Sequence, residues 1–442
     1  MKNFIFESYS FNTEKKELTL NYSFDSKMFF SEKITFVSDK ILNIDEVGAL
    51  NNVFKYLHLI AGISYYKLFL PPNIIIKTVD LNKKQADFFN EFYLNGLGEF
   101  LCRNNIKNAN NIIKFPYKKN VINRSINLKL SNKYCIPVGG GKDSIVSIEI
   151  LKKGMNDDDI ILGSVNTAKS IEDTIKIAGL KSFAIKREIS PKLIEINNEL
   201  DKYGAYNGHV PITGILAFIL CAGAIFYDYG TVLVSNERSA NVGNVKFDNM
   251  FVNHQWSKSF QCEKMLNNFF KNYVINDFEY LSFLRPLSEI HIAKIFSKLN
   301  NYHNIFKSCN KNFKINGRIT NWCCDCDKCR FVFLILAVFL KKDKMIEIFG
   351  TNILDDERQM NGYLELVGLK NFKPFECVGE VSECIYAFRH INETFFDSIV
   401  VKRIRPLIAD LKINKNVKLF DLNNKHLLNN KLLSILISYL KR

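Results

Sequence analysis

Three consecutive glycines lie between a short apolar run and a helical pattern, and this junction could bind phosphate. Residues 135–144 read Cys-Ile-Pro-Val-Gly-Gly-Gly-Lys-Asp-Ser. Glycine lets the backbone turn its N–H groups toward one point, and the N-terminus of the following helix adds partial positive charge. A Walker A loop is excluded, because Asp143 follows Gly-Lys where that motif has Ser or Thr. The alternative to a phosphate site is an ordinary strand-to-helix turn.

The same residues resemble the loop of the PP-loop ATP pyrophosphatases. That loop is written S-G-G-x-D-S, and here Gly139 takes the place of the serine. Those enzymes cleave ATP between the α and β phosphates. The resemblance therefore implies that a substrate is adenylated, not phosphorylated as by a kinase.

Four cysteines have the spacing of a metal site. Three recur at every third position and one lies upstream; the set is Cys309, Cys323, Cys326 and Cys329. Four thiolates suit tetrahedral Zn²⁺, whose structural sites are closed and rich in sulfur. An iron–sulfur cluster or four reduced thiols without metal are the alternatives, and Cys324 is a fifth candidate ligand. We expect a structural zinc site that fixes the cysteine loop against a helix beginning at Arg330.

Polar side chains also gather at four places beside expected helix or strand ends. They are His209, Glu237, Arg238, His254, Lys258 and Arg285. Glu237 and Arg238 follow an expected strand, where a doubly wound sheet binds its ligand. Each of these groups alone would more often be a surface residue or a satisfied core residue. Four such places downstream of one phosphate loop favour a shared site.

Strand and helix patterns alternate around these residues. Strands are expected at 160–166, 182–186 and 231–235, and helices at 170–178 and 212–227. This alternation predicts a parallel sheet covered by helices on both faces, with ligands at the carboxyl ends of its strands.

The predicted fold class is α/β, in three units. Residues 1–125 form an α+β N-terminal domain, and residues 130–300 form a PP-loop ATP-binding domain with a parallel sheet, like the adenine nucleotide alpha hydrolases. Residues 301–442 form a helical C-terminal region that contains the cysteine cluster. In the first unit the expected strands and helices are 17–25, 33–37, 73–78, 47–70 and 85–100.

Composition favours a globular cytoplasmic protein. The chain has 442 residues, 47% of them apolar, and a net charge of +15. The uncharged stretch at 210–227 contains Pro211 and two glycines, and the apolar stretch at 331–340 is shorter than the roughly 20 residues of a membrane span, so both are expected to be buried helices. Glu7 interrupts the apolar start, which argues against a signal peptide. The positive charge suits a nucleotide diphosphate or a nucleic acid, but no dense Lys/Arg tract indicates nucleic acid.

Nine short segments, in order along nearly the whole chain, are similar to the UDP-N-acetylmuramoyl-L-alanyl-L-glutamate epimerases of the MurL type. They are residues 62–67, 96–100, 137–144, 207–211, 235–240, 252–259, 284–289, 326–334 and 374–380. One departure is Cys324, which stands where we expect glycine in the family.

The resemblance implies an activity and its substrates. Members of that family convert the terminal L-glutamate of the peptidoglycan precursor, a UDP-muramoyl-dipeptide, to D-glutamate; they use ATP and Mg²⁺ and release AMP and pyrophosphate. An α-hydrogen beside an anionic carboxylate is a poor acid, because the carbanion would add a second negative charge. A neutral acyl-adenylate removes this obstacle, since its carbonyl can accept the electrons as an enolate. A general base contributes about 10²–10⁴-fold to such a step.

On this hypothesis the glycine loop binds the nucleotide. The groups involved are the backbone N–H groups of Gly139, Gly140 and Gly141 and the hydroxyl of Ser144, which would bind the departing pyrophosphate. Lys142 would neutralise phosphate charge, and Asp143 would help to place Mg²⁺.

The base and the substrate contacts are assigned by chemical type. His209 and His254 are the favoured bases, because imidazole titrates near neutrality, with Glu237 third and Cys377 fourth. The cationic groups expected to hold the glutamate side chain or the diphosphate are Arg238, Lys258 and Arg285.

Two other functions fit parts of the pattern. A different PP-loop enzyme, such as a 7-cyano-7-deazaguanine synthase or a tRNA-modifying adenylating enzyme, could pair this loop with a late zinc site, but the synthase family has no unit like residues 1–125. A basic module without catalytic activity could use the loop to bind the phosphates of RNA or DNA. For the epimerase, the substrate is either the peptidoglycan precursor or a related glutamyl conjugate.

Overall fold

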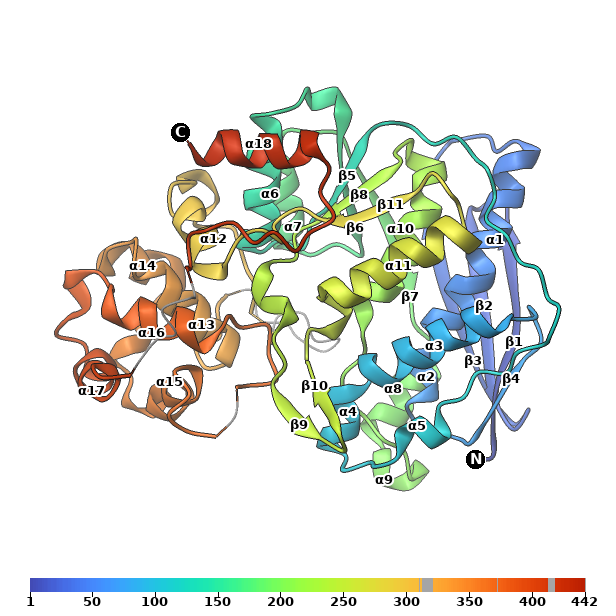
Figure 1. Ribbon diagram of the computed structural model, residues 1–442, viewed down its shortest axis with the longest axis horizontal. Helices are drawn as coiled ribbons and strands as arrows, with labels where there is room; N and C mark the ends of the chain where they lie inside the picture. Colours follow the sequence, from blue (N-terminus) through green and yellow to red (C-terminus); the bar gives the residue numbers. More distant parts are fainter. Residues whose placement is uncertain (310, 312–320, 372, 412–417, 442) are drawn as a thin grey trace.

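One sheet of nine strands runs through the part of the chain that the structure describes. The structure is a computed structural model, and it describes residues 1–442 except 310, 312–320, 372, 412–417 and 442. The strand order is β11-β8-β5-β6-β7-β3-β2-β1-β4. Figure 1 shows this sheet with helices on both sides and a separate group of helices, α13–α17, at the end far from β1.

Five neighbouring strands are parallel and form the half of the sheet that contains the glycine loop. They are β5 (Tyr134–Pro137), β6 (Ile160–Val165), β7 (Ser182–Glu188), β8 (Thr231–Val234) and β11 (Glu279–Ser282). The chain moves outward from β5 to β6 and β7, and then returns to β8 on the other side of β5. The carboxyl ends of β5 and β8 therefore flank a topological switch point, which is where open α/β sheets bind ligands.

The first strands of the chain extend this sheet rather than forming one of their own. They are β1 (Asn3–Asn12), β2 (Glu17–Phe24), β3 (Met28–Phe36) and β4 (Asn73–Ile76). β3 pairs antiparallel with β7, from Lys33 opposite Glu188 to Phe36 opposite Ile185. The N-terminal strands are thus hydrogen-bonded directly to the glycine-loop half.

Side chains along the central strands point alternately to the two faces of the sheet, and each face has its own apolar core. In β5, Cys135 packs into one core, while Tyr134 and Ile136 pack into the other. Both faces are covered, which is why these strands are apolar at consecutive positions. The helices on the Cys135 face are α1 (Ile44–Ala61), α3 (Lys83–Gly96), α10 (Ile212–Tyr227) and α11 (Phe260–Tyr273).

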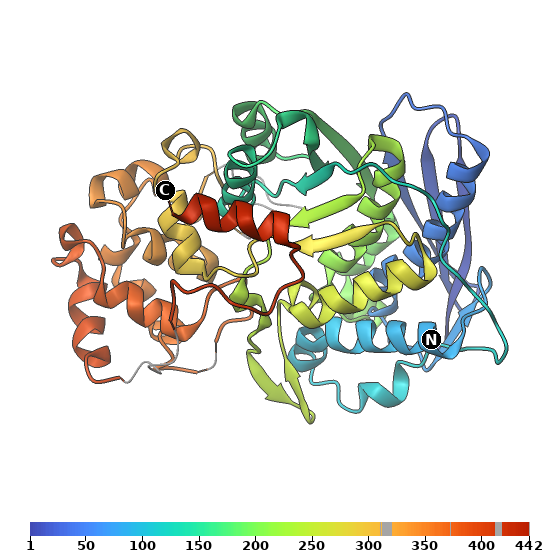
Figure 2. The ribbon, with the colours of Figure 1, turned by 45° about the horizontal axis from the view of Figure 1, so that its top comes forward.

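The opposite face is covered by helices from the glycine loop and from later in the chain. They are α6 (Lys142–Lys152), α7 (Lys169–Ala178), α12 (Glu289–Phe296) and α18 (Asn430–Leu440). α18 returns from the C-terminal region to lie beside α6 (Figure 2). The rest of that region is helical, as predicted: α13 (Asp327–Leu336), α14 (Lys342–Phe349), α15 (Met360–Leu366), α16 (Val381–Arg389) and α17 (Ile399–Ile408).

The remaining short α-helices and strands lie, in chain order, between the longer elements. They are α2 (Ile63–Tyr66), α4 (Gly98–Arg103), α5 (Ala109–Ile112), α8 (Pro191–Asn198), α9 (Leu200–Tyr203) and the hairpin of β9 (Val245–Phe247) and β10 (Met250–Val252).

The uncharged stretch at 210–227 is the buried helix α10, as predicted. Its residues from Ala217 to Phe226 are all buried, which explains the absence of a polar face. Among the helices that the structure describes, none combines the length and the apolar character that a membrane crossing requires.

A buried ion pair lies at the seam between β3 and β7, and it generates a prediction. Glu32 is fully buried, accepts a hydrogen bond from Arg187 Nε at 2.7 Å, and accepts another from the Tyr65 hydroxyl at 2.9 Å. Glu32→Ala leaves Arg187 buried without its partner, so the free energy of unfolding should fall by about 3–5 kcal/mol. Denaturant unfolding measures this change.

The matched control is Lys33→Ala, at the next position on the same strand. Lys33 pairs with Glu17 at 3.1 Å on the surface, and such pairs contribute at most about 1 kcal/mol. Equal losses in the two variants would contradict the role given to the buried pair.

Candidate active site

The glycine loop follows β5 and begins α6 at the switch point of the sheet. Gly140 has φ +72°, and a Cβ atom there would lie 2.5 Å from Ser170 Oγ. Only glycine satisfies both conditions. Gly141 is the extended residue that precedes α6. The N–H groups at the start of α6 therefore border the loop, as a phosphate site requires.

The ammonium group of Lys142 is buried directly behind this loop. Its side chain is 1% exposed and forms ion pairs with Asp143 and with Glu289 of α12. Burial would lower the pKa of Lys142, but the two carboxylates raise it above its ordinary value. Burial also opposes the charge of Asp143, yet Lys142 and Lys328 hold the pKa of its carboxyl below the usual range. Lys142 faces the interior here, so its direct contact with phosphate stays a prediction.

A thiol lies at the meeting point of two lysines and a histidine. Cys377 is half-buried in the segment between α15 and α16. Lys258 Nζ lies 3.4 Å from its Sγ, and Lys328 Nζ donates to its carbonyl oxygen. Burial would raise the pKa of the thiol, but Lys258 and a hydrogen bond with His254 lower it to about 6. These neighbours therefore favour the thiolate form of Cys377 at neutral pH.

The two predicted histidines lie together, and one carboxylate serves both. Glu99 of α4 forms an ion pair with Nδ1 of His254, and its Oε2 lies 3.5 Å from Nδ1 of His209. Burial would lower the pKa of His254, but Cys377 and Glu99 raise it to about 9. Burial and the neighbouring His254 lower the pKa of His209 to about 4. These shifts favour a cationic His254 and a neutral His209 at neutral pH.

The other predicted residues differ in how far they reach into this cluster. Glu237 is buried and accepts a hydrogen bond from Ser239 at 3.1 Å. Arg238 lies beside Glu380, with Nε 3.6 Å from the carboxylate.

Arg285 has no exposed surface, and its guanidinium points into the protein. It donates to Glu263 and to the carbonyl oxygens of Glu237 and Lys258. Here Arg285 positions the backbone of two site residues, and its contact with substrate stays a prediction.

Sequence reasoning did not select Glu99, Glu289 or Lys328. Each is a charged residue in the first turn of a helix, and each is at most 6% exposed. A charge at a buried helical position needs a partner, and that was the available signal.

The four predicted cysteines converge and could bind a metal. The Sγ atoms of Cys309, Cys323, Cys326 and Cys329 lie within 4.8 Å of one another. Cys329 Sγ is 3.6 Å from that of Cys323 and 3.5 Å from that of Cys326. Metal–sulfur bonds of about 2.3 Å in a tetrahedron place sulfurs about 3.8 Å apart. The spacing therefore fits a closed tetrahedral site.

Cys324 points away from the cluster. Its Sγ donates to the carbonyl oxygen of Phe349 at 3.3 Å. Its φ is +54°, a conformation that favours glycine, which explains why glycine would be expected at this position. The helix behind the cluster, α13, begins at Asp327, three residues before the predicted start.

The cysteine cluster is joined to the glycine loop. Lys307 N donates to the carbonyl oxygen of Gly140 at 2.8 Å, two residues before Cys309. A Cβ atom on Gly141 would lie 3.3 Å from Cβ of Ser308. A metal at the four cysteines would hold this segment against the loop.

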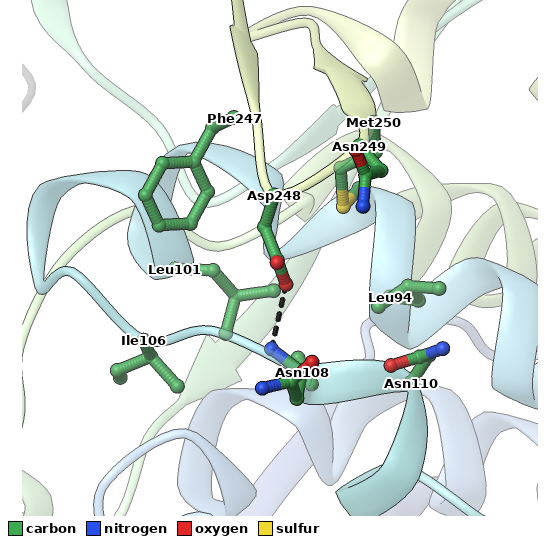
Figure 3. A pocket seen from close by; sticks show the side chains of 10 residues that line it. Leu94, Leu101, Ile106, Asn108, Asn110, Phe247, Asp248, Asn249 and Met250 are labelled. Atoms are coloured by element: carbon green, nitrogen blue, oxygen red, sulfur yellow. Dashed lines mark hydrogen bonds between the residues drawn. The ribbon is translucent and has the colours of Figure 1, made fainter.

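A separate pocket lies under the β9–β10 hairpin, and none of these groups is among its lining residues (Figure 3). Its lining is mostly apolar and amide, and Asp248 is its one charged residue among those described. Asp248 accepts a hydrogen bond from the backbone N–H of Asn108 at 2.6 Å, so this carboxylate closes the hairpin onto α5. The pocket offers no acid–base pair, and the candidate site is the cluster at the glycine loop.

Two family models together match most of the chain. The family model described as the MurL N-terminal domain matches residues 1–283, and the MurL C-terminal domain matches residues 305–418. The chain belongs to the MurL family.

Curated relatives in the MurL family carry one name, UDP-N-acetyl-alpha-D-muramoyl-L-alanyl-L-glutamate epimerase. The protein of Xanthomonas oryzae pv. oryzae is 37% identical over 402 residues, which cover 90% of this chain and 88% of that protein. The protein of Salinispora tropica is 36% identical over 399 residues, covering 89% of this chain and 85% of that protein. No solved structure matches the chain significantly.

The charge of Cys377 is testable by alkylation. A thiolate reacts with iodoacetamide and a thiol does not, so the rate rises with pH through the pKa of the thiol. We expect the rate at Cys377 to reach half its maximum near pH 6, since Lys258 and His254 lower the pKa. Peptide mass spectrometry resolves Cys102, whose pKa burial raises above 9.0, as an internal control. A common midpoint near pH 9 for both cysteines would contradict the assignment.

The ligand set is testable by metal content. Cys323→Ser should lose bound metal, because it removes one of four converging sulfurs. Cys324→Gly should keep the metal and at least the parent stability, since it relieves left-handed strain of about 1 kcal/mol. Elemental analysis with denaturant unfolding measures both. Loss of metal in Cys324→Gly would show that Cys324 is a ligand.

Proposed function

We propose that this protein converts the terminal L-glutamate of UDP-N-acetylmuramoyl-L-alanyl-L-glutamate to D-glutamate in the synthesis of the peptidoglycan precursor. The observation that carries the proposal is the similarity, at 36–37% identity over about nine-tenths of the chain, to three proteins that all bear the name of this epimerase. The protein is therefore an isomerase that acts on an amino-acid stereocentre.

We further propose that the reaction consumes ATP through an acyl-adenylate. A carboxylate oxygen of the substrate attacks the α-phosphorus of ATP, and pyrophosphate leaves. The α C–H bond then breaks, its electrons move onto the carbonyl oxygen as an enolate, and a proton returns to the opposite face. Water finally cleaves the acyl–phosphate bond and releases AMP. Donors aimed at the enolate oxygen would contribute about 10²–10³-fold.

The glycine loop is the part of the protein that would hold the nucleotide. Its position at the carboxyl end of β5, beside β8, supports this assignment, as does the need for glycine at Gly140. Ser144 Oγ donates to the Gly141 carbonyl oxygen at 3.1 Å and lies in the first turn of α6. This geometry supports a PP-loop function for residues 139–144.

Asp143 would hold the Mg²⁺ that accompanies ATP. Its side chain is 28% exposed and carries the oxygen ligands that Mg²⁺ prefers. When bound, Mg²⁺ neutralises phosphate charge. Lys142 keeps Asp143 ionised, so the carboxylate is ready to act as a ligand.

The diphosphate of the substrate would bind near Arg238. A pocket of about 660 Å³ opens there, and its lining includes the cations Arg238, Lys418 and Lys425 together with the carboxylates Glu380 and Asp421. Guanidinium and ammonium groups bind phosphate by charge-assisted hydrogen bonds. The pocket could therefore hold the nucleotide part of the substrate while the peptide reaches the thiol and the histidines.

The four cysteines would hold a structural Zn²⁺. An all-sulfur, closed donor set suits Zn²⁺ in a structural role. The two other functions considered from the sequence gain no support, because the matching family model includes residues 1–125.

The test of the proposal is pyrophosphate release with UDP-muramoyl-L-Ala-L-Glu and ATP, combined with chiral analysis of the glutamate. The parent protein should release pyrophosphate and form the D-isomer. Asp143→Ala should lower pyrophosphate release by at least about 100-fold, because it removes the proposed Mg²⁺ ligand.

Asp158→Ala is the matched control, since Asp158 lies exposed on the surface, paired with Lys181. It should leave both activities unchanged. Undiminished release by Asp143→Ala would refute the loop assignment, and conversion of the substrate without ATP would refute the adenylate.

A further inference from the structure

We propose that the thiolate of Cys377 removes the α-proton of the activated L-glutamate, and that His254 and Glu99 position it for this step. The inference rests on the proposed function and assigns the base within it. Cys377 touches the reacting atoms in this account, whereas His254 and Glu99 act through Cys377.

The first support is the convergence of distant segments on one sulfur. Lys258 and His254 come from the segment after β10, Lys328 from α13, and Cys377 from the loop before α16. Lys258 Nζ lies 3.4 Å from Sγ, and His254 is hydrogen-bonded to the same thiol. Nδ1 of His254 is taken by Glu99, which leaves Nε2 for Cys377. A carboxylate, an imidazole and a thiol in this order form the arrangement in which an adjacent base activates a sulfur.

The second support is the negative charge of the thiol together with the partial exposure of the residue. Cys377 is half-buried, not sealed in a core as Cys135 and Cys221 are. Lys258 also acts electrostatically on Asp143 of the glycine loop. Lys258 therefore lies near both the thiol and the proposed nucleotide site.

The third support is that the competing bases are less suited. The raised pKa of His254 favours its protonated form, and Glu99 occupies its Nδ1, so this imidazole is poorly suited to accept another proton. Glu237 is 4% exposed and accepts from Ser239. His209 is neutral, with its Nδ1 3.5 Å from Glu99, and remains available for a separate proton transfer.

The step conserves charge inside the cluster. The α C–H bond breaks, an S–H bond forms on Cys377, and the electron pair moves to the carbonyl oxygen as an enolate. The enolate replaces the thiolate as the anion beside Lys258, so this ammonium group keeps a counter-charge. A buried cation left alone would be costly, and this exchange avoids that cost.

The experiment separates adenylation from proton removal. Parent protein, Cys377→Ala and Cys377→Ser are incubated with UDP-muramoyl-L-Ala-L-Glu and ATP in D₂O, and pyrophosphate release and α-deuterium are measured. Both variants should keep substrate-dependent pyrophosphate release and lose deuterium incorporation by about 10²–10⁴-fold. Cys102→Ser, at another half-buried cysteine, should retain both. Melting temperatures confirm that the variants fold.

A pH profile tests the positioning role of His254. Deuterium incorporation by the parent should rise with pH through a midpoint near 6. The other charged or titratable groups around Cys377 are Lys258, Lys328 and the neighbouring Glu376. His254→Gln should move that midpoint upward, because it removes a hydrogen bond and a positive charge from the thiolate. A merely structural role would not move it.

Three results would overturn the inference. The first is deuterium incorporation by Cys377→Ala within about tenfold of the parent rate. The second is loss of pyrophosphate release in a folded Cys377→Ala, which would place the thiol in adenylation. The third is a glutamyl thioester on Cys377 in acid-quenched parent protein, which would make it a nucleophile. Failure of the proposed function itself is distinct, because the parent would then release no pyrophosphate.

Discussion

The buried ammonium group of Lys142 is the interaction on which the site depends. Lys142 is at the start of α6, and its partners Asp143 and Glu289 connect the glycine loop to α12. Glu289 also lies 3.9 Å from Lys328 of α13, so the same set of charges reaches the helical C-terminal region. Removing one member would leave the others buried and unpaired, at a cost of about 3–5 kcal/mol. Charge neutrality thus fixes the loop relative to helices that lie about 150 to 190 residues later in the chain.

The need for every buried charge to have a partner extends from the loop to the thiol. It explains why the site has so many cations. Lys258 and Lys328 face Asp143 electrostatically and contact Cys377, while His254 links Cys377 to Glu99. A nucleotide, a carboxylate and an enolate are all anions at some stage of the proposed reaction. The cysteine cluster supports this arrangement from outside, through the bond from Lys307 to Gly140.

Local signals in the sequence predicted most of the elements and the form of the loop, but they missed β1 and β11, and long-range contacts were not readable from the sequence. The stretch at 212–227 is apolar throughout and became α10, and the strand that ends in glycines became β5. The pairing of β3 with β7 joins residues about 150 apart, with no local pattern to announce it. His254 and Glu99 are separated by 155 residues, and Cys377 in its sequence context looks like any other cysteine. Its rank as fourth candidate base reflected residue type alone, because the lysines that charge it come from elsewhere in the chain.

The account depends on the removal of a negative charge before the neighbouring C–H bond breaks. Nuclear magnetic resonance of the glutamyl α-position in D₂O, with the parent protein and with or without ATP, tests this most directly. The account predicts deuterium at that carbon only when ATP is present, together with AMP formation. Deuterium incorporation at the same rate without any nucleotide would contradict it.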